Sequence, residues 1–193
     1  MPATKEHCKF CFDVLVAELQ GDSINKVQPD FQDAEFPLFV TWNKITDGED
    51  TLRGCIGTFS QLKIVEGLRK YSIISAMRDR RFNPIQKKEL KKLKNCVSLL
   101  TNFEEADNHL DWEIGKHGIT IYFIDDGEEY NATFLPEVAE EQEWTKRETI
   151  DHLIRKSGYD QRITKELRSS LSVTRYQSSK VELSFSEYLK MKQ

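Results

Sequence analysis

The sequence has few cysteines and no long apolar run, and both absences limit where the protein is expected to work. Its first residues, MPATKEHCKFC, lack the hydrophobic stretch that secretion or membrane spanning requires. We therefore expect no signal peptide and no membrane contact, and a location in the cytoplasm and nucleus. There the four cysteines, Cys8, Cys11, Cys55 and Cys96, are expected to be reduced.

Signatures of common cofactors and metals are missing as well. There is no Walker loop, dinucleotide fingerprint, Gly-x-Ser-x-Gly elbow or set of kinase motifs, so no cofactor is indicated. Cys8 and Cys11 have the spacing of zinc ligands, but both fall on the apolar stripe of a predicted helix, and no second close pair follows. The four histidines form no ligand-spaced set, and the sequence predicts no metal site.

What the sequence does contain is enough apolar material for a folded core. With 38% hydrophobic and 31% charged residues in a length of 193, the chain suits one ordered domain, with or without a small annex. The formal net charge of −4 gives no general attraction to nucleic acid or anionic membranes.

Periodicity and turn residues predict an α+β fold. Apolar residues at helical spacing run over 8–19 and stop at Gly21, and a second helix is expected at about 64–78. FPLFVTWNKI, an Asp47-Gly48 turn and LRGCIGTF form a hairpin. Further strands are expected in NCVSLLTNF, GITIYFID, EYNATFL and SVTRYQSSKVELSF, and further helices at 87–94, at 137–144 after Pro136, and through Lys156 after a Thr145 cap. Consecutive hairpins with helices between them favour a mostly antiparallel sheet flanked by helices.

The stretch LRGCIGTF, residues 52–59, is the strongest candidate for a functional site. Alternation along a strand puts Arg53, Cys55 and Gly57 on one face, where the guanidinium would favour the thiolate and Gly57 would leave room for a ligand. Gly54 and Gly57 each need a reason in a strand, such as a bulge or the close approach of another group. The alternative is a small buried cysteine in a tightly packed core, since no adjacent base is present to activate the sulfur.

SAMRDRRFNP, residues 75–84, gathers arginines at the end of the second predicted helix. Arg78 and Arg81 are candidates to hold a phosphate or carboxylate, because a guanidinium grips such anions with two N–H groups. The alternative is a capped helix end, with Asp79 paired locally to the arginines.

The basic character continues beyond this motif. Residues 78–94 contain eight cations and two acids, a local charge of +6 in a protein of −4. A solvated helix face explains such a run better than nucleic-acid binding, because only Phe82 is available to stack on bases. Residues 125–143, with eight acids and no lysine or arginine, show the opposite bias and could complement it within the fold or between subunits.

His117 is the histidine of most interest. It lies in GKHGIT, where Gly115 and Gly118 suggest a turn that presents the imidazole. Folding could bring this ring towards Cys55, so we add His117 to Cys55 and Arg53 as a candidate catalytic residue. An exposed turn histidine is the simpler alternative.

Seven segments resemble the AMMECR domain family, named for a human chromosomal region linked to Alport syndrome, midface hypoplasia and elliptocytosis. They are FPLFVTW, LRGCIGTF, SAMRDRRFNP, VSLLTNFE, DWEIGKHGI, ATFLPEVA and TRYQSSK, in family order over about residues 5–190. The resemblance implies a single domain over 5–190 of the stand-alone eukaryotic type, with a larger sheet-containing part and a smaller helical subdomain. It places the suspected site at Arg53, Gly54, Cys55 and Gly57, with Arg81, Phe82 and Pro84 from the second motif.

The resemblance does not bring a defined reaction, because no biochemical activity is established for the family. Its prokaryotic members occur beside Memo-type and radical S-adenosylmethionine domains, which suggests shared small-molecule chemistry or a Memo-like partner. Our leading hypothesis is a small-ligand-binding protein with thiol-dependent enzyme chemistry at Cys55, where Arg78 or Arg81 holds an anionic small molecule. The competing hypothesis is a non-catalytic adaptor for a Memo-like or nuclear regulatory protein, and a nucleic-acid-associated regulator comes third. The sequence leaves open whether the protein is an enzyme.

Overall fold

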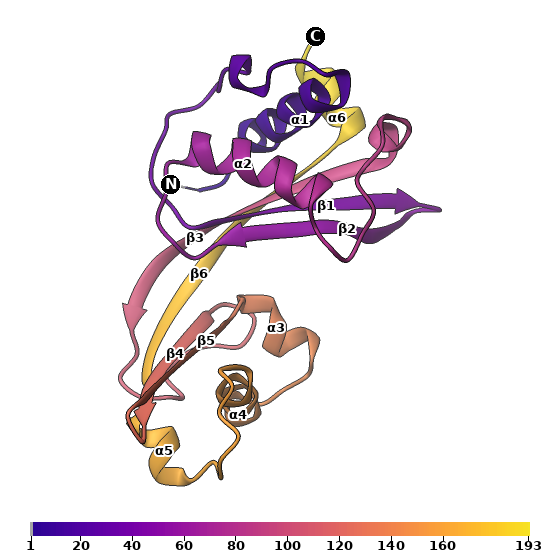
Figure 1. The fold of residues 1–193 in the computed structure, drawn as a ribbon. Coiled ribbons are helices and arrows are strands. Elements are labelled where there is room, and N and C mark those ends of the chain that lie inside the picture. Colours follow the sequence, from indigo (N-terminus) through magenta and orange to yellow (C-terminus); the bar gives the residue numbers. More distant parts are fainter. Residues whose placement is uncertain (1) are drawn as a thin grey trace. The chain divides into compact units, whose positions relative to one another are not determined.

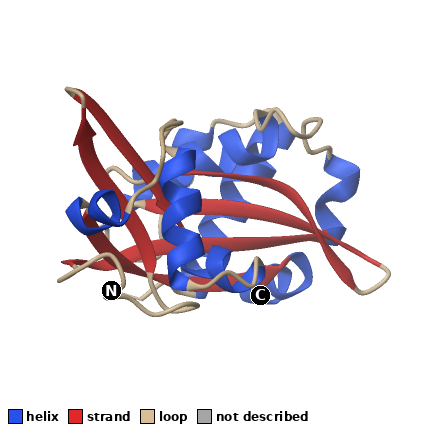
Figure 2. Ribbon diagram, turned by 90° about the horizontal axis from the view of Figure 1, so that it is seen from below, coloured by secondary structure: helices blue, strands red, loops and turns tan. Residues whose placement is uncertain are grey.

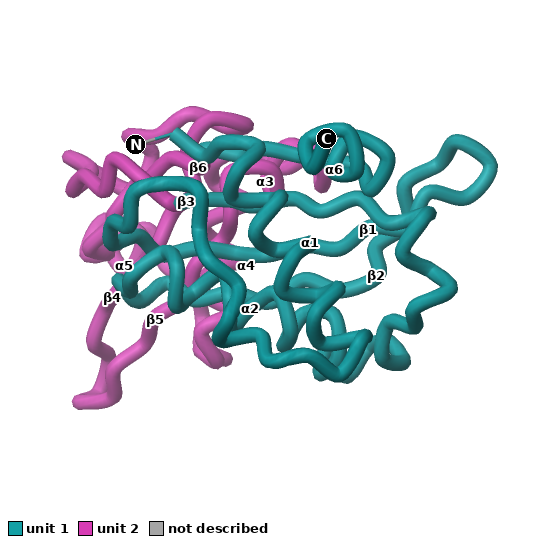
Figure 3. The backbone as a smooth tube through the Cα atoms, turned by 90° about the horizontal axis from the view of Figure 1, so that it is seen from above, with its two compact units in different colours: residues 1–99, 179–193 teal, residues 100–178 magenta. Residues whose placement is uncertain are grey.

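The structure, a computed structural model, describes residues 2–193 and divides into two compact units. Unit 1 comprises the chain up to residue 99 together with 179–193, and unit 2 comprises 100–178 (Figure 3). Six strands follow the order β2-β1-β3-β6-β4-β5, and the long strands β3 (Leu93–Glu105) and β6 (Ser172–Ser184) each contribute residues to both units (Figure 1). Helices and antiparallel strands occur together in the chain, which confirms the predicted α+β class (Figure 2).

Unit 1 contains the hallmark strand and the N-terminal helices. Its elements besides β3 and β6 are α1 (Lys5–Gln20), η1 (Ile24–Lys26), β1 (Leu38–Thr46), β2 (Glu49–Thr58), α2 (Ile64–Met77), η2 (Lys87–Lys92) and α6 (Phe185–Met191). β1 pairs antiparallel with β2 on one side and with β3 on the other. β2 is therefore an edge strand, with one row of backbone groups that no other strand covers.

The helices α1 and α2 cover one face of this part of the sheet. Three alternate residues of β1 are fully buried: Leu38, Val40 and Trp42. Trp42 packs edge-on against Phe12 of α1, with ring centroids 5.0 Å apart, and its Nε1 donates to the Ser72 carbonyl of α2 at 3.0 Å. Because strand residues alternate, Thr41 faces the opposite side of the sheet.

Unit 2 has its own core around a hairpin. It contains β4 (Gly118–Asp125), β5 (Glu128–Phe134), α3 (Pro136–Glu141), α4 (Lys146–Lys156) and α5 (Lys165–Ser170). β4 pairs antiparallel with β5 and with β6. Alternate residues of β4 pack with the apolar stripe of α4 in one buried cluster, which includes Ile119, Ile121, Phe123, Ile150, Leu153 and Ile154.

Several predicted boundaries are confirmed and two are not: the helix predicted over 137–144 ends at Glu141, and the one predicted over 87–94 also ends early. Pro136 begins α3, and Thr145 caps α4 by accepting a hydrogen bond from the Glu148 amide. The helix predicted over 87–94 is a 3₁₀ helix that ends at Lys92, because Leu93 begins β3. Short 3₁₀ turns of this kind are common as connectors, and here η2 leads directly into β3.

Within residues 2–193, no helix is both long enough and apolar enough to span a lipid bilayer.

Candidate functional site

LRGCIGTF occupies β2 and its C-terminal end, and packing explains its first glycine. A Cβ atom on Gly54 would overlap the backbone carbonyl of Ser75 in α2. The close approach that the sequence predicted at this glycine is therefore found between β2 and α2.

Arg53 lies at a β-bulge, which interrupts the alternation expected along the strand. No residue of β1 is opposite Arg53, because the pairing passes from Gly54 directly to Leu52. The guanidinium binds the carboxylate of Glu89 through two contacts, 3.1 Å from Nε to Oε1 and 3.2 Å from Nη2 to Oε2. Its Nη1 group donates to the Asn83 carbonyl at 2.7 Å.

This pairing balances the charge of Arg53. Burial opposes the ionisation of Glu89, but hydrogen bonds from Arg53 and from the Gln86 amide outweigh it and lower the pKa of Glu89 to about 2. Only 14% of the Arg53 side chain and 11% of the Glu89 side chain are exposed. Arg53 therefore holds η2 against β2, and its charge is directed at Glu89 rather than at the thiol of Cys55.

Asp79 and Arg81 form a clamp on the backbone of Cys55, at the free edge of β2. The Cys55 N–H donates to Asp79 Oδ2 at 3.0 Å, and Arg81 Nη2 donates to the Cys55 carbonyl at 3.2 Å. Arg81 also binds Asp79, 3.0 Å from Nε to Oδ1 and 2.7 Å from Nη2 to Oδ2. The clamp supplies the two hydrogen bonds that a neighbouring strand would make at this position.

The two members of the clamp differ in exposure. Hydrogen bonds from Arg81 hold the pKa of Asp79 well below its usual range, and the Asp79 side chain is only 4% exposed. Hydrogen bonding to Asp79 raises the pKa of Arg81, and the nearby Cys55 adds to this rise. The Arg81 side chain is 54% exposed, and its Nη1 group has no hydrogen-bond partner among residues 2–193. Arg81 is thus a cation beside Cys55 that solvent reaches.

Cys55 differs from the other cysteines in exposure and surroundings. It is half-buried, whereas Cys8, Cys11 and Cys96 are buried. Burial raises the pKa of the Cys11 thiol to about 12 and also raises the pKa of Cys8 and Cys96. The sulfur of Cys55 accepts a hydrogen bond from Thr41 Oγ1 at 3.1 Å, and Thr41 is its cross-strand partner in β1. Among the four thiols, Cys55 is the one a reagent reaches most easily.

Gly57 has a packing role of its own. A Cβ atom there would overlap the Leu38 carbonyl and the side chain of Phe39. Phe39 also packs edge-on against Phe59, with ring centroids 5.1 Å apart. The room that glycine provides, which the sequence suggested was for a ligand, is taken by Phe39.

Two other predicted site residues make no hydrogen bond or ion pair with this arrangement within residues 2–193. Arg78 is the C-cap residue of α2, and its exposed side chain makes no hydrogen bond or ion pair within residues 2–193. His117 belongs to unit 2, where its Nδ1 accepts a hydrogen bond from the Glu113 amide at 3.0 Å. Burial, together with Lys116 and Arg175, lowers the pKa of His117. Only 7% of His117 is exposed, so the exposed turn histidine considered as an alternative is not found.

Thr41 and Glu89 are the residues that the sequence did not single out. A regular hairpin with Asp47-Gly48 at its turn would pair Cys55 with the neighbour of Thr41 in β1. The bulge at Arg53 shifts the pairing by one residue, so Cys55 faces Thr41. The register of the hairpin was therefore a usable signal for Thr41. Glu89 lies 36 residues from Arg53, and no local pattern indicates that they pair.

The CxxC pair of α1 belongs to the core of unit 1. Cys8 and Cys11 are fully buried, and the Cys8 thiol donates to the Val181 carbonyl at 3.4 Å. No group of three or more His, Cys, Asp or Glu side chains within residues 2–193 is placed to hold a metal ion.

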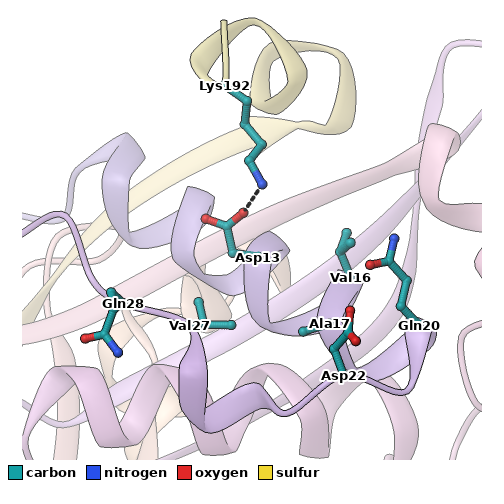
Figure 4. A pocket seen from close by; sticks show the side chains of 8 residues that line it. All are labelled: Asp13, Val16, Ala17, Gln20, Asp22, Val27, Gln28 and Lys192. Carbon is teal, nitrogen blue, oxygen red and sulfur yellow. Dashed lines mark hydrogen bonds and ion pairs between the residues drawn. The ribbon is translucent and has the colours of Figure 1, made fainter.

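A cavity of about 320 Å³ lies beside α1, away from the hallmark strand. Its lining residues are Asp13, Val16, Ala17, Gln20, Asp22, Val27, Gln28 and Lys192 (Figure 4). Asp13 Oδ1 accepts hydrogen bonds from Lys192 Nζ and from the Tyr188 hydroxyl, both at 2.8 Å. The Asp13–Lys192 pair is thus satisfied within the protein, and we assign no function to this cavity.

Comparisons with known proteins identify the family of the chain. The sequence model of the AMMECR1 family matches residues 8–181. An uncharacterized protein of Arabidopsis thaliana is 47% identical over 190 residues, which cover 97% of this chain and 88% of that protein. An uncharacterized protein of Schizosaccharomyces pombe is 39% identical over 187 residues, which cover 96% of this chain and 95% of that protein.

A solved structure shows the same fold at lower sequence identity. The crystal structure of an uncharacterized protein from Pyrococcus horikoshii has a TM-score of 0.68 to this chain and is 24% identical to it. The likeness covers 91% of this chain and 89% of that chain. With the family match and the close relatives, these findings show that the chain belongs to the AMMECR1 family.

Proposed function

We propose that the protein binds a small anionic molecule beside Cys55 and that the Cys55 thiol takes part in its chemistry. The observation that carries this proposal is the half-buried thiol itself, the most accessible of the four. Gly54, Gly57 and Arg53 make contacts that stabilise the fold. The Cys55 side chain makes one hydrogen bond, from Thr41, and keeps part of its surface exposed.

Arg81 is the residue that holds the anion in this proposal. Its Nη1 group carries two N–H donors that no described residue uses, while Asp79 fixes the other side of the guanidinium. A guanidinium that is already oriented loses little freedom when an anion binds, and charge-assisted hydrogen bonds are stronger than neutral ones. Arg81 therefore replaces Arg53 as the cation of the site.

A hydrogen-bond donor and a cation lie next to the thiol. The reactive form of cysteine is the thiolate, and a donated hydrogen bond from Thr41 stabilises negative charge on the sulfur. The positive charge of Arg81 acts in the same direction. No histidine is among the hydrogen-bond partners of Cys55, so the proposed chemistry does not depend on a paired base.

Alkylation with a matched pair of reagents tests the proposal. Iodoacetate carries a carboxylate and iodoacetamide is its neutral analogue, so the ratio of their rates reports anion recognition at the sulfur. We expect Cys55 to react before the three buried cysteines and to favour iodoacetate more than a model thiol does. Mass spectrometry that resolves each cysteine measures both rates.

Two arginine variants complete this experiment. Arg81→Gln should lower the iodoacetate preference to that of a model thiol. Arg80→Gln, at an exposed arginine whose side chain has no partner within residues 2–193, should leave it unchanged. The proposal fails if Cys55 reacts no faster than a model thiol near neutral pH, or if the two variants behave alike while both remain folded by circular dichroism.

A second candidate function is a non-catalytic adaptor, and unpaired charge favours it. Six exposed cations make no side-chain hydrogen bond or ion pair within residues 2–193: Arg78, Arg80, Lys87, Lys88, Lys91 and Lys92. Such a surface suits an acidic partner, such as a Memo-like or nuclear regulatory protein.

Cys55→Ala separates the two functions. An adaptor keeps its partner in this variant, whereas a thiol enzyme loses activity with its fold intact. A nucleic-acid-associated regulator would instead show salt-dependent binding to mixed oligonucleotides.

A further inference from the structure

Unit 2 contains a second cavity, formed by the loop after β3 and by the helices α4 and α5. Its volume is about 320 Å³. The residues that line it are His109, Leu110, Arg147, Lys165, Arg168 and Ser169. Cavities of this size are at the lower end of the range found for small-molecule sites, roughly 300–1,000 Å³.

Three cations line this cavity, and only one of them has an acidic partner. Arg168 binds both carboxylate oxygens of Asp151, 2.6 Å from Nε and 2.8 Å from Nη2. Arg147 and Lys165 are exposed, and their side chains make no hydrogen bond or ion pair within residues 2–193. The cavity therefore has two cations that form no ion pair within the described chain, unlike Lys192, which pairs with Asp13 beside α1.

The apolar wall of the cavity is fixed in place. Leu110 is 41% exposed, although it is a large apolar side chain. The loop that carries it is held by two hydrogen bonds to backbone carbonyls, from Trp112 Nε1 to His109 and from Lys146 Nζ to Leu110, both at 3.1 Å. Trp112 is itself only 2% exposed, so the loop is anchored in the core of unit 2. A preformed wall lowers the entropic cost of binding.

His109 adds hydrogen-bonding capacity without charge. Burial, together with the nearby Arg168, lowers the pKa of His109, so its ring is neutral at pH 7. Arg147 and Lys165 supply the positive charge that is available to a ligand, because Arg168 is paired with Asp151.

We infer that this cavity binds an organic anion with an apolar body, of the class of a carboxylate on a short hydrocarbon chain. The hydrocarbon lies against Leu110 and the carboxylate binds Arg147 and Lys165. This site belongs to unit 2 and does not depend on the thiol chemistry proposed at Cys55 in unit 1.

Titration calorimetry with three probes tests the assignment. Octanoate has both the anion and the hydrocarbon, octan-1-ol has the hydrocarbon alone, and acetate has the anion alone. We expect one octanoate per chain, and affinities at least about tenfold weaker for the other two, because each lacks one of the paired interactions. Octan-1-ol or acetate binding as tightly as octanoate, or octanoate failing to bind at millimolar concentration, would overturn the inference.

Matched variants locate the binding. Arg147→Ala combined with Lys165→Ala should weaken octanoate by about tenfold or more, since the charge-assisted contacts are lost. Lys87→Ala combined with Lys88→Ala removes the same charge from unit 1 and should have no effect. Octanoate affinity that survives the first double variant rejects the site.

Two single variants separate this site from the one at Cys55. Ser169→Trp keeps every charge but fills the cavity, and it should also abolish octanoate binding while the melting temperature stays near that of the parent. Cys55→Ala should leave octanoate binding unchanged. Loss of binding in Cys55→Ala, or full binding in Ser169→Trp, would place octanoate elsewhere and overturn the inference.

Discussion

Two arginine–carboxylate pairs flank the Cys55 strand, and they differ in what they leave free. In the Arg53–Glu89 pair both side chains are largely buried, and every nitrogen of the guanidinium donates to the protein. In the Asp79–Arg81 pair the carboxylate is buried, but the arginine is 54% exposed and its Nη1 group has no acceptor in the described chain. The first pair joins η2 to β2, while the second closes the edge of β2 and leaves two donors facing solvent.

The difference shows that a cation close to a cysteine in the sequence need not direct its charge at the thiol. Arg53 is two residues from Cys55, yet its charge is balanced by Glu89. Arg81 is 26 residues away and is the guanidinium that contacts the Cys55 backbone. What decides a functional role is which donors remain after the fold has used the others.

The largest expected effect comes from Asp79→Ala. This change leaves the Cys55 amide without its acceptor and removes the carboxylate that Arg81 binds, so we expect a loss of about 3 kcal/mol in the free energy of unfolding. Urea denaturation measures it. Asp30→Ala, at an exposed aspartate, is the control, and a surface change of this kind costs under about 0.5 kcal/mol. Equal losses in the two variants would mean that the clamp does not stabilise β2.

The second-largest effect is expected when acid pH weakens the Arg53–Glu89 pair. The pKa of Glu89 is about 2 in the folded protein, below its usual value of 4.5. Its ionised carboxylate therefore stabilises the folded state at pH values above 4.5. This contribution, up to about 3 kcal/mol, is lost as the pH falls from about 5 towards 2. Urea midpoints of the parent and of Glu89→Gln should therefore converge over that range. A difference that stays constant with pH would contradict the pairing.

Conservative arginine variants should separate the two pairs. Arg53→Lys cannot form the two-pronged contact, and we expect it to cost about 1–2 kcal/mol of stability with no change in the alkylation of Cys55. Arg81→Lys should cost less stability, since its side chain is exposed, and should reduce the iodoacetate preference. Denaturation and site-resolved alkylation measure both effects. The comparison breaks down if Arg53→Lys changes the reagent preference as much as Arg81→Lys does.

The smallest effect is expected at Thr41. Thr41→Val removes the hydroxyl that donates to the Cys55 sulfur while keeping the shape of the side chain, so alkylation should slow by about two- to tenfold. Thr51→Val is the matched control, because the Thr51 hydroxyl donates to the Lys44 carbonyl in the same hairpin and not to a sulfur. An unchanged rate in Thr41→Val would remove the hydroxyl from the proposed site.

Much of the fold could be predicted because its signals are local. Asp47 and Gly48 adopt positive φ angles at the predicted hairpin turn, and Gly21 ends α1 in the left-handed conformation. Thr145 and Glu148 form the capping box that begins α4. Each of these features depends on residues within a few positions of one another. The helix predicted over 87–94 ends two residues earlier than expected, because Leu93 pairs with Lys44 of β1 and belongs to β3.

By itself, the sequence determined the family, the α+β class and the candidates Cys55 and Arg81. Only the tertiary structure decided that Arg53 pairs with Glu89, that Phe39 occupies the space beside Gly57, and that Asp79 binds the Cys55 amide 24 residues away. The physical reason is that a buried donor or acceptor takes whichever partner packing brings within hydrogen-bond distance. That partner is set by contacts between distant segments, which a local pattern of residue types does not record.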